Sequence, residues 1–208
     1  MSYRGPIAES WKKKKSQMRW IPLVRGIGSS RGKTAPTADN PEKRMYNPPI
    51  VDEDFEVPQA LQTERMLLRP LTIHHAVRDY DAVMTSEQRL RTVHDPGGEW
   101  PLGLTLEQNI IELGWHQTEF QLRTSFAYSV LSPDESEVMG CMYIYPTRKP
   151  GYDVEITMWV RQSRVDEGLD EHLFETVEAW IAQRWPFANP AYPGRRIAFD
   201  KWRDLPDG

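Results

Sequence analysis

Among the 30 acidic residues, 5 histidines and 1 cysteine of this chain of 208 amino acids, the positions that could do chemistry differ in their settings. Glu155 is a carboxylate within Val154–Val160, where apolar residues occupy every second position. This alternation is typical of a half-buried strand, so Glu155 is either an acid–base group or part of the solvated face. The single cysteine, Cys141, excludes a disulfide or a cysteine-based zinc site within one chain, and its apolar neighbours indicate a small buried side chain.

The other motifs with chemical potential are less specific. The histidines have no spacing typical of metal ligation or of a catalytic triad, which favours surface or packing roles. They are His74, His75, His94, His116 and His172. Residues 31–34, RGKT, are similar to the end of a phosphate-binding loop. The earlier glycine is misplaced and no apolar strand precedes it, so we reject that match.

Charge divides the chain into two regions. Residues 1–50 contain 11 basic and 3 acidic side chains, whereas residues 51–208 contain 15 basic and 27 acidic ones. The first region is also rich in Gly, Ser, Pro and Asn, and it has little apolar surface to offset the entropy cost of ordering. We therefore expect a basic, poorly ordered N-terminal extension over residues 1–55 and one folded domain over residues 56–208.

The basic arm allows two interpretations. Lysines at positions 12–15 lie between Trp11 and Trp20, and basic residues mixed with aromatic ones bind phosphate backbones or anionic surfaces. This arm is the one part of the sequence that suggests a nucleic-acid partner, and it does so only weakly. The alternative is a solubilising tail, a targeting piece or a misassigned start, because no recognised nucleic-acid module is present. We expect a cytoplasmic protein without a membrane span, since the apolar runs are short and the start does not have the pattern of a secretory signal.

Capping residues and helical spacing predict helices in the body. Thr72 opens the first helix, and Thr105 begins a capping box that opens a longer one. The last and longest covers residues 166–185, with apolar residues along one face. The stripe expected to be buried on the first helix comprises Ile73, Val77, Tyr80 and Met84.

Strand signals complete the predicted fold. They lie at residues 65–71, 126–131, 138–145, 154–160 and 195–199. Short links join the three middle runs, which indicates an antiparallel meander. The final strand–helix–strand step implies one parallel pair. The expected class is α+β, with a mixed but largely antiparallel sheet flanked by helices.

Residues 56–202 resemble the GNAT acetyltransferase superfamily. Residues 61–71, LQTERMLLRPL, are similar to the opening strand of many members, and residues 126–131 and 137–144 to the next two strands. Residues 153–160, DVEITMWV, look like the fourth strand, which leads into the acyl-CoA loop and its helix. The resemblance implies a GNAT-like fold and an N-acetyltransferase that uses acetyl-CoA as co-substrate and no metal.

The same resemblance implies roles for individual residues. Glu155 would take a proton from the acceptor ammonium, often through water, and the start of the 166–185 helix would hold the pyrophosphate. Main-chain groups of the fourth strand would pair with the pantetheine arm. The implied cofactor-binding set is Met158, Trp159, Val160, Arg161, Arg164, Gly168, Leu169 and Asp170. Structural alternatives stay open, since Gly168 also suits a tight turn and Trp159 also suits a core.

Two departures from the family pattern limit this interpretation. The acyl-CoA loop has Val165 and Asp170 where the family has Gln or Arg and Gly or Ala, so that only Gly168 fits. Carboxylates there repel a pyrophosphate, although Arg161 and Arg164 partly offset them. Members also continue into a helix that supplies a tyrosine acid and then two more strands. Relative to them the chain is C-terminally truncated, and Tyr192 is the nearest substitute for that acid.

Two functional hypotheses follow. The first is an acyl-CoA-dependent N-acetyltransferase acting on a small-molecule or protein amine, with Glu155 as base. The second is a catalytically inactive GNAT-like module that serves binding or regulation. The intact strands favour the first, and the altered loop and short C-terminus favour the second. Exposed sheet edges make a homodimer reasonable in either case.

Overall fold

The computed structural model describes residues 48–94, 96 and 98–208. Residues 49–208 form one compact unit. Its elements are β1 (Leu61–Gln62), β2 (Leu67–Pro70), η2 (Ile73–His75), α2 (Ala76–Met84), α3 (Glu87–Val93), α4 (Leu106–Leu122), β3 (Phe126–Leu131), β4 (Val138–Pro146), β5 (Val154–Val160), η3 (Gln162–Arg164), α5 (Leu169–Arg184) and α6 (Phe199–Asp204). The predicted N-terminal arm lies almost entirely outside the described residues.

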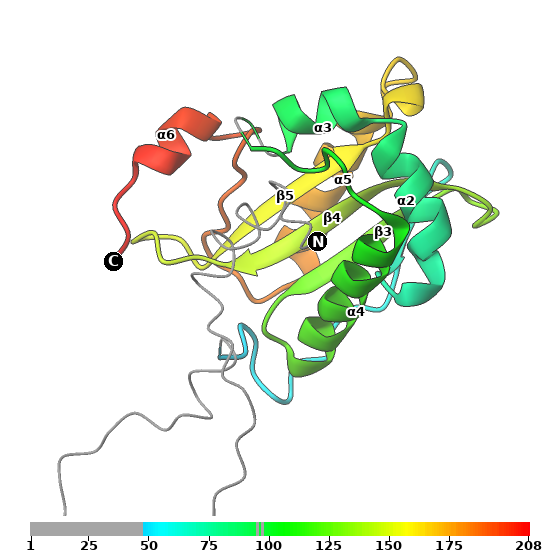
Figure 1. Cartoon of the computed structure of the whole chain (residues 1–208). Coiled ribbons are helices and arrows are strands. Elements are labelled where there is room, and N and C mark those ends of the chain that lie inside the picture. The colour runs from blue at the N-terminus through cyan, green and yellow to red at the C-terminus, as the bar shows by residue number, and fades with distance from the viewer. Residues whose placement is uncertain (1–47, 95, 97) are drawn as a thin grey trace, which may run out of the picture. The chain divides into compact units, whose positions relative to one another are not determined.

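The strands form one sheet in which every neighbour along the chain is also a neighbour in space. The order is β1-β2-β3-β4-β5 and each pair is antiparallel, which confirms the predicted meander. In the longest pairing Gly140 lies opposite Val160 and Tyr145 opposite Glu155. Strand β5 is therefore the last strand of the sheet, and its outer edge does not face another strand of the sheet (Figure 1).

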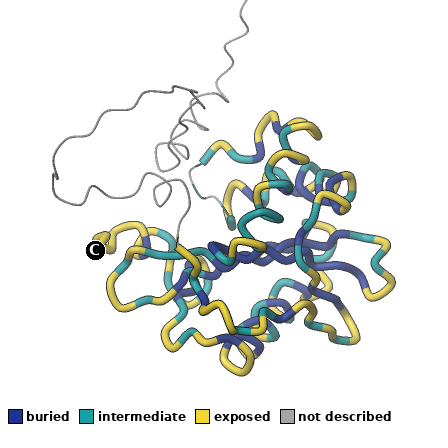
Figure 2. Tube along the Cα trace, turned by 90° about the horizontal axis from the view of Figure 1, so that it is seen from below, coloured by how far each residue is buried: buried dark blue, intermediate teal, exposed yellow. Residues whose placement is uncertain are grey.

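Helices cover both faces of the sheet (Figures 1 and 2). One face packs on α5 through residues such as Ile156, Met158 and Leu173. The other face packs on α2, α3 and α4, with Cys141 and Trp159 fully buried there. The alternation along β5 thus divides its side chains between two cores, and Glu155 projects from the same face as Trp159.

The predicted final strand is wrong in its position and type. Residues 195–199 form no strand; Pro193 and Ile197 close a small loop, and Phe199 begins α6. The parallel contact implied by the strand–helix–strand step does occur, but it is a single bridge between Glu155 and Ala191. Gly194 has φ +78°, and this left-handed turn carries the chain away from β5 before a longer pairing can form.

The buried face of α2 also differs from the predicted stripe. Val77 is 68% exposed and Ile73 is 44% exposed, whereas Asp79 is buried. The Asp79 carboxylate accepts hydrogen bonds from the Asn109 amide at 2.9 Å and the Cys141 thiol at 3.3 Å. These partners come from α4 and β4, so the apolar spacing of α2 alone does not indicate which side turns inward.

Residues just before position 55 make contacts with the rest of the compact unit. Val51 is buried, and the Ile50 amide donates a 2.8 Å hydrogen bond to the Arg123 carbonyl. The Arg123 guanidinium in turn donates to the carbonyls of Asp52 and Phe55. Residues just before 55 are therefore packed on the domain. None of the helices formed by the described residues is long and apolar enough to cross a membrane.

Candidate active site

The outer edge of β5 forms the floor of the candidate site. The Ile156 amide donates to the Ala191 carbonyl at 2.8 Å, and the Ala191 amide donates to the Val154 carbonyl at 2.9 Å. Main-chain groups of even-numbered residues therefore point outward, and those of odd-numbered residues point to β4. Met158 and Val160 follow on the outward side, and the described segments supply no main-chain partner to them there.

The segment after Ala191 diverges from β5 instead of continuing the pairing. The amides of residues 195–197 all turn back to the Tyr192 carbonyl, and the Arg195 side chain reaches the start of α5. Among the described residues, main-chain pairing of this segment with β5 is thus limited to the bridge at Glu155 and Ala191. We use the word wedge for the outer edge of β5 at Met158 and Val160 together with residues 192–195. Of the residues expected to pair with a pantetheine arm, Met158 and Val160 belong to this wedge, whereas the main chain of Trp159 faces β4.

The start of α5 lies after the C-terminal end of β5. Gly168 is the N-cap with φ +69°, and nothing lies within 4 Å of the Cβ that another residue would carry there. The first α-helical hydrogen bond runs from the His172 amide to the Gly168 carbonyl, so the amides of Leu169, Asp170 and Glu171 precede the helical ladder. These amides suit an anion. The Leu169 side chain itself is buried in the core.

The two arginines expected to attract a pyrophosphate are both in ion pairs. Arg161 pairs with Glu137 at 2.9 Å and with Asp81 at 3.0 Å. Arg164 pairs with Glu137 at 2.5 Å and with Glu167 at 2.9 Å. Glu137 therefore holds both guanidiniums beside the start of β4, which reduces the positive charge that they present to a ligand.

Asp170 is the centre of a three-residue ion cluster. Its carboxylate accepts two hydrogen bonds from Arg195, at 2.6 and 2.9 Å, and pairs with Arg89 of α3 at 3.2 Å. Burial opposes ionisation of Asp170, but the two arginines outweigh it and lower its pKa. Two guanidiniums and one carboxylate leave the cluster with a formal charge of +1. The predicted repulsion at Asp170 is therefore offset by partners that the loop pattern does not include.

Glu155 lies on the opposite face of β5 from the α5 core, beside α6. Burial raises its pKa, and the Trp202 indole and Lys149 act in the other direction. The Trp202 Nε1–H donates a 3.1 Å hydrogen bond to Glu155 Oε2. A carboxylate with a raised pKa is a stronger base than an exposed one, which suits removal of a proton from an ammonium.

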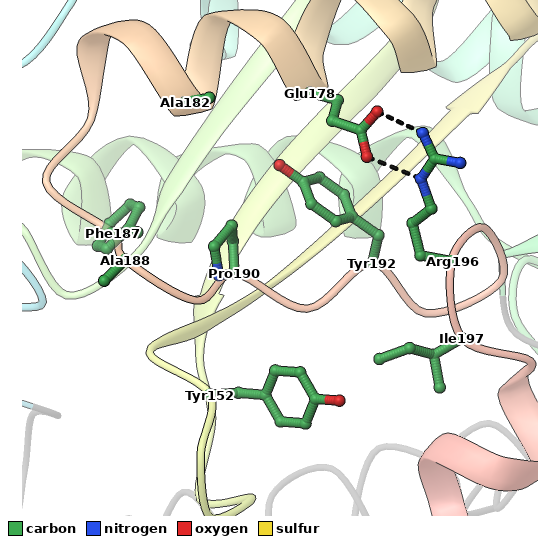
Figure 3. Close-up of a pocket in the computed structure, with 9 residues that line it drawn as sticks. All are labelled: Tyr152, Glu178, Ala182, Phe187, Ala188, Pro190, Tyr192, Arg196 and Ile197. Carbon is green, nitrogen blue, oxygen red and sulfur yellow. Dashed lines mark hydrogen bonds and ion pairs between the residues drawn. The ribbon is translucent and has the colours of Figure 1, made fainter.

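The structure does not bring Tyr192 and Glu155 together. The Tyr192 ring packs on Phe174 of α5 at 5.7 Å, in the α5 core. Burial and the nearby Glu178 raise the pKa of Tyr192 to about 12. Its side chain instead lines a cavity of about 600 Å³, beside the ion pair of Glu178 and Arg196 (Figure 3). Glu155 is not among the residues that line this cavity.

Three residues of the site were absent from the sequence-based candidates. They are Arg89, Arg195 and Trp202. Arg89 lies on a short helix far from the loop in sequence, and residues 195–199 carried the signal of a strand. No local pattern links them to Asp170 or Glu155, because the contacts span 25 to 81 positions of the chain.

Comparison with known proteins finds similarity in structure and none in sequence. No family model matches the chain, and no curated protein matches it in sequence. RimL, a ribosomal L7/L12 α-N-protein acetyltransferase solved with coenzyme A, is 16% identical with a TM-score of 0.51, over 61% of this chain and 69% of that one. The ribosomal-protein-S5-alanine acetyltransferase of Vibrio fischeri is 12% identical with a TM-score of 0.50, over 61% and 67%.

The fold is therefore GNAT-like, as the sequence resemblance predicted. RimL without coenzyme A gives the same result, at 15% identity and a TM-score of 0.50 over 64% of this chain and 70% of that one. The matched features are the antiparallel sheet and its flanking helices. Identities this low concern the fold alone, so the chemistry rests on the residues of this chain.

Proposed function

We propose that this chain transfers an acyl group, most simply acetyl, from a coenzyme A thioester to the nitrogen of an amine. The observation that carries the proposal is the outer edge of β5 at Met158 and Val160, which lies between the half-buried Glu155 carboxylate and the start of a long helix. Among the described residues, nothing pairs with the outward main-chain groups of Met158 and Val160, and both residues are buried. Buried main-chain groups need partners, and an extended arm with amide groups supplies them.

The residues around the wedge fit the parts of coenzyme A. The amides of Met158 and Val160 would pair with the pantetheine arm. The amides of Leu169 to Glu171 would face the diphosphate, and the +1 cluster of Asp170, Arg89 and Arg195 lies at the same helix start. In this proposal Arg161 and Arg164 hold the loop through Glu137 more than they bind phosphate.

Glu155 would supply the base. An amine is mostly protonated at neutral pH, so its nitrogen must lose a proton before it attacks. The Glu155 carboxylate takes that proton, directly or through water, and the nitrogen lone pair forms a bond to the thioester carbonyl carbon. The nitrogen, which is cationic after the attack, loses one further proton as the carbon–sulfur bond breaks. The departing sulfur takes up one proton, so that the products are an amide and a free thiol. We assign no acid role to Tyr192, since its side chain packs in the α5 core.

The acceptor would be an amine of a small molecule or of a protein. RimL and the Vibrio fischeri protein are named for ribosomal protein substrates, which makes a protein amine a reasonable first choice. An acidic body, with 27 acidic against 15 basic residues after position 50, favours a cationic partner.

The Asp170 cluster supports one alternative. If Arg89 and Arg195 stay bound to Asp170, they close the helix start to a diphosphate, and the chain is then a GNAT-like binding or regulatory module without activity. Coenzyme A binding separates the two functions.

Calorimetric titration with acetyl-CoA, followed by assay of thiol release with a panel of amines, tests the proposal. We expect micromolar binding in the wild type and in Glu155→Gln, and a fall in turnover of about 100-fold or more in the variant. Glu64→Gln removes an exposed carboxylate and should match the wild type in both measurements. No heat and no thermal shift with acetyl-CoA would favour the inactive module.

A further inference from the structure

Helix α6 places one indole directly on the proposed base. Trp202 is 6% exposed, and its Nε1–H points to Glu155 Oε2 at 3.1 Å. An indole has one N–H donor and no acceptor. It can therefore donate to the Glu155 carboxylate, and it does not compete with that carboxylate for a proton. The contact joins positions 47 residues apart, between the last helix and the edge strand.

Further contacts fix α6 in this place. The Lys149 ammonium donates to the Leu205 carbonyl at 2.6 Å and lies 5.5 Å from the centre of the Trp202 ring. Tyr152 meets the same ring edge-on, with centroids 5.2 Å apart. At the other end of the helix, Phe199 packs against Gly194 so closely that a Cβ on this glycine would lie 2.3 Å from the ring. The indole is therefore held from several sides.

The charged and titratable groups around Glu155 come from four elements. Trp202 and Lys149 lower the pKa of Glu155, and burial raises it. Tyr145 lies opposite Glu155 on β4, and burial raises the pKa of its hydroxyl, with further increases from Glu119, Glu155 and Glu112. Among the described residues, Trp202 is thus the one whose side chain is seen to donate a hydrogen bond directly to the Glu155 carboxylate.

We propose that Trp202 is a positioning residue for the base: its indole N–H holds Glu155 Oε2, so that Oε1 is left to take the proton of the acceptor. This role rests on the proposed function. A hydrogen bond to one oxygen also stabilises the charged carboxylate, which offsets part of the increase that burial causes in the pKa of Glu155. A purely structural Trp202 would support α6 without affecting the titration of Glu155.

The first test uses the unaltered chain. In an NMR pH titration we expect the Trp202 indole resonance to shift with the midpoint at which Glu155 titrates. In Glu155→Gln the amide oxygen still accepts the hydrogen bond but no longer titrates, so that shift should disappear. An indole resonance that ignores the Glu155 midpoint would overturn the proposal, whatever the activity of the protein.

The second test removes only the donor. Trp202→Phe keeps an aromatic ring on α6, and we expect the Glu155 midpoint and the acid limb of kcat/KM to move up by about half to one pH unit. Below that midpoint kcat/KM should fall about three- to tenfold, with acetyl-CoA affinity unchanged. Lys201→Ala, on the exposed side of α6, is the control and should move neither. An unmoved Glu155 midpoint in folded Trp202→Phe would overturn the role.

The two proposals fail in different ways. Absence of acetyl-CoA binding would end the proposed function, while the coupled titration of Trp202 and Glu155 would still be measurable. Active enzyme whose acid limb is the same in Trp202→Phe would end the inference alone.

Discussion

Asp79, which is buried, and Glu155, which is half-buried, have different chemical settings. Asp79 is enclosed between α2, α4 and β4 with two hydrogen-bond donors, Asn109 and Cys141. Glu155 lies at the edge of the sheet beside Trp202 and the wedge. Burial raises the pKa of both. Only Glu155 borders the candidate cofactor site, and this position, rather than the pKa, is the reason to assign it the chemistry.

Asp79 should make the stability of the fold depend on pH. Because burial raises its pKa, the folded state keeps the proton to higher pH than the unfolded state, whose value is about 3.9. Stability from this group is thus highest at low pH and is lost as pH rises through the folded pKa. Between pH 4 and pH 7 we expect the free energy of unfolding to fall less in Asp79→Asn than in the wild type. Urea denaturation at each pH measures this change.

The control for Asp79 is an exposed carboxylate. Asp54→Asn should follow the wild-type curve at every pH. A wild type and an Asp79→Asn variant with parallel curves would show that the buried carboxylate is not protonated in the folded state at any of these pH values.

Asp170 should weaken coenzyme A binding through its charge. Removing one negative charge from the cluster leaves two arginines for a diphosphate. The repulsion between two unit charges about 4 Å apart in a largely solvated site is about 1 kcal/mol. We expect Asp170→Asn to bind acetyl-CoA about five- to tenfold more tightly at low salt, with a lower melting temperature because Arg89 and Arg195 lose their partner. Calorimetry and thermal denaturation measure both.

A matched charge change tests the location of this effect. Glu175→Gln alters an exposed residue of the same helix and should change the affinity little. Weaker binding in Asp170→Asn would instead mean that Asp170 orients the two arginines towards the ligand.

At the scale of elements, sequence patterns located most helices and strands but not the faces they bury. The strands at 126–131, 138–145 and 154–160 follow from alternation and turns, and the capping box at Thr105 is present, with the Gln108 amide bonded to the Thr105 hydroxyl. The α5 helix begins at Leu169 instead of 166, because Gly168 adopts the left-handed conformation. The face of α2 depends on partners elsewhere in the chain, so its own spacing does not predict it.

Gly194 should control the position of α6. A Cβ at Gly194 would lie 2.3 Å from the Phe199 ring, in addition to the strain of φ +78°. We expect Gly194→Ala to displace α6, to break the contact of Trp202 with Glu155, and to destabilise the fold by about 2 to 4 kcal/mol. Urea denaturation and Trp202 indole NMR measure these changes.

Gly151 offers the matched control for Gly194. It has φ +86°, but nothing lies within 4 Å of its Cβ position. Gly151→Ala should therefore cost only about 1 kcal/mol of strain and leave the Trp202 resonance in place. Equal effects of the two substitutions would mean that Phe199 moves aside at little cost.

At the scale of the whole molecule, one sheet separates two cores and its edge carries the candidate site. The α5 core and the α2–α4 core each use one face of β5, so the strand that borders the wedge is fixed from both sides. A rigid floor suits a site that must hold an extended ligand and a base in register.

The N-terminal limit of the domain can be tested by two deletions. Val51 and Phe55 belong to or pack on the α5 core, and Arg123 binds the carbonyls of Asp52 and Phe55. We expect residues 49–208 to unfold in one cooperative transition, and residues 57–208 to be less stable by about 2 to 4 kcal/mol. Denaturation curves of the two chains measure this difference. Equal stability of the two chains would place the boundary of the folded domain near residue 55, as the charge pattern predicts.

The sequence by itself determined the class of fold, the antiparallel meander, the long helix and the candidacy of Glu155, because alternation, helical spacing and capping are local properties. Only the tertiary structure decided which groups meet. It gave Asp170 two arginine partners, placed Trp202 on Glu155, and left Tyr192 in the α5 core, away from the base. These contacts join residues far apart in the chain, and their formation depends on how the helices pack on a sheet and not on the pattern of any one segment.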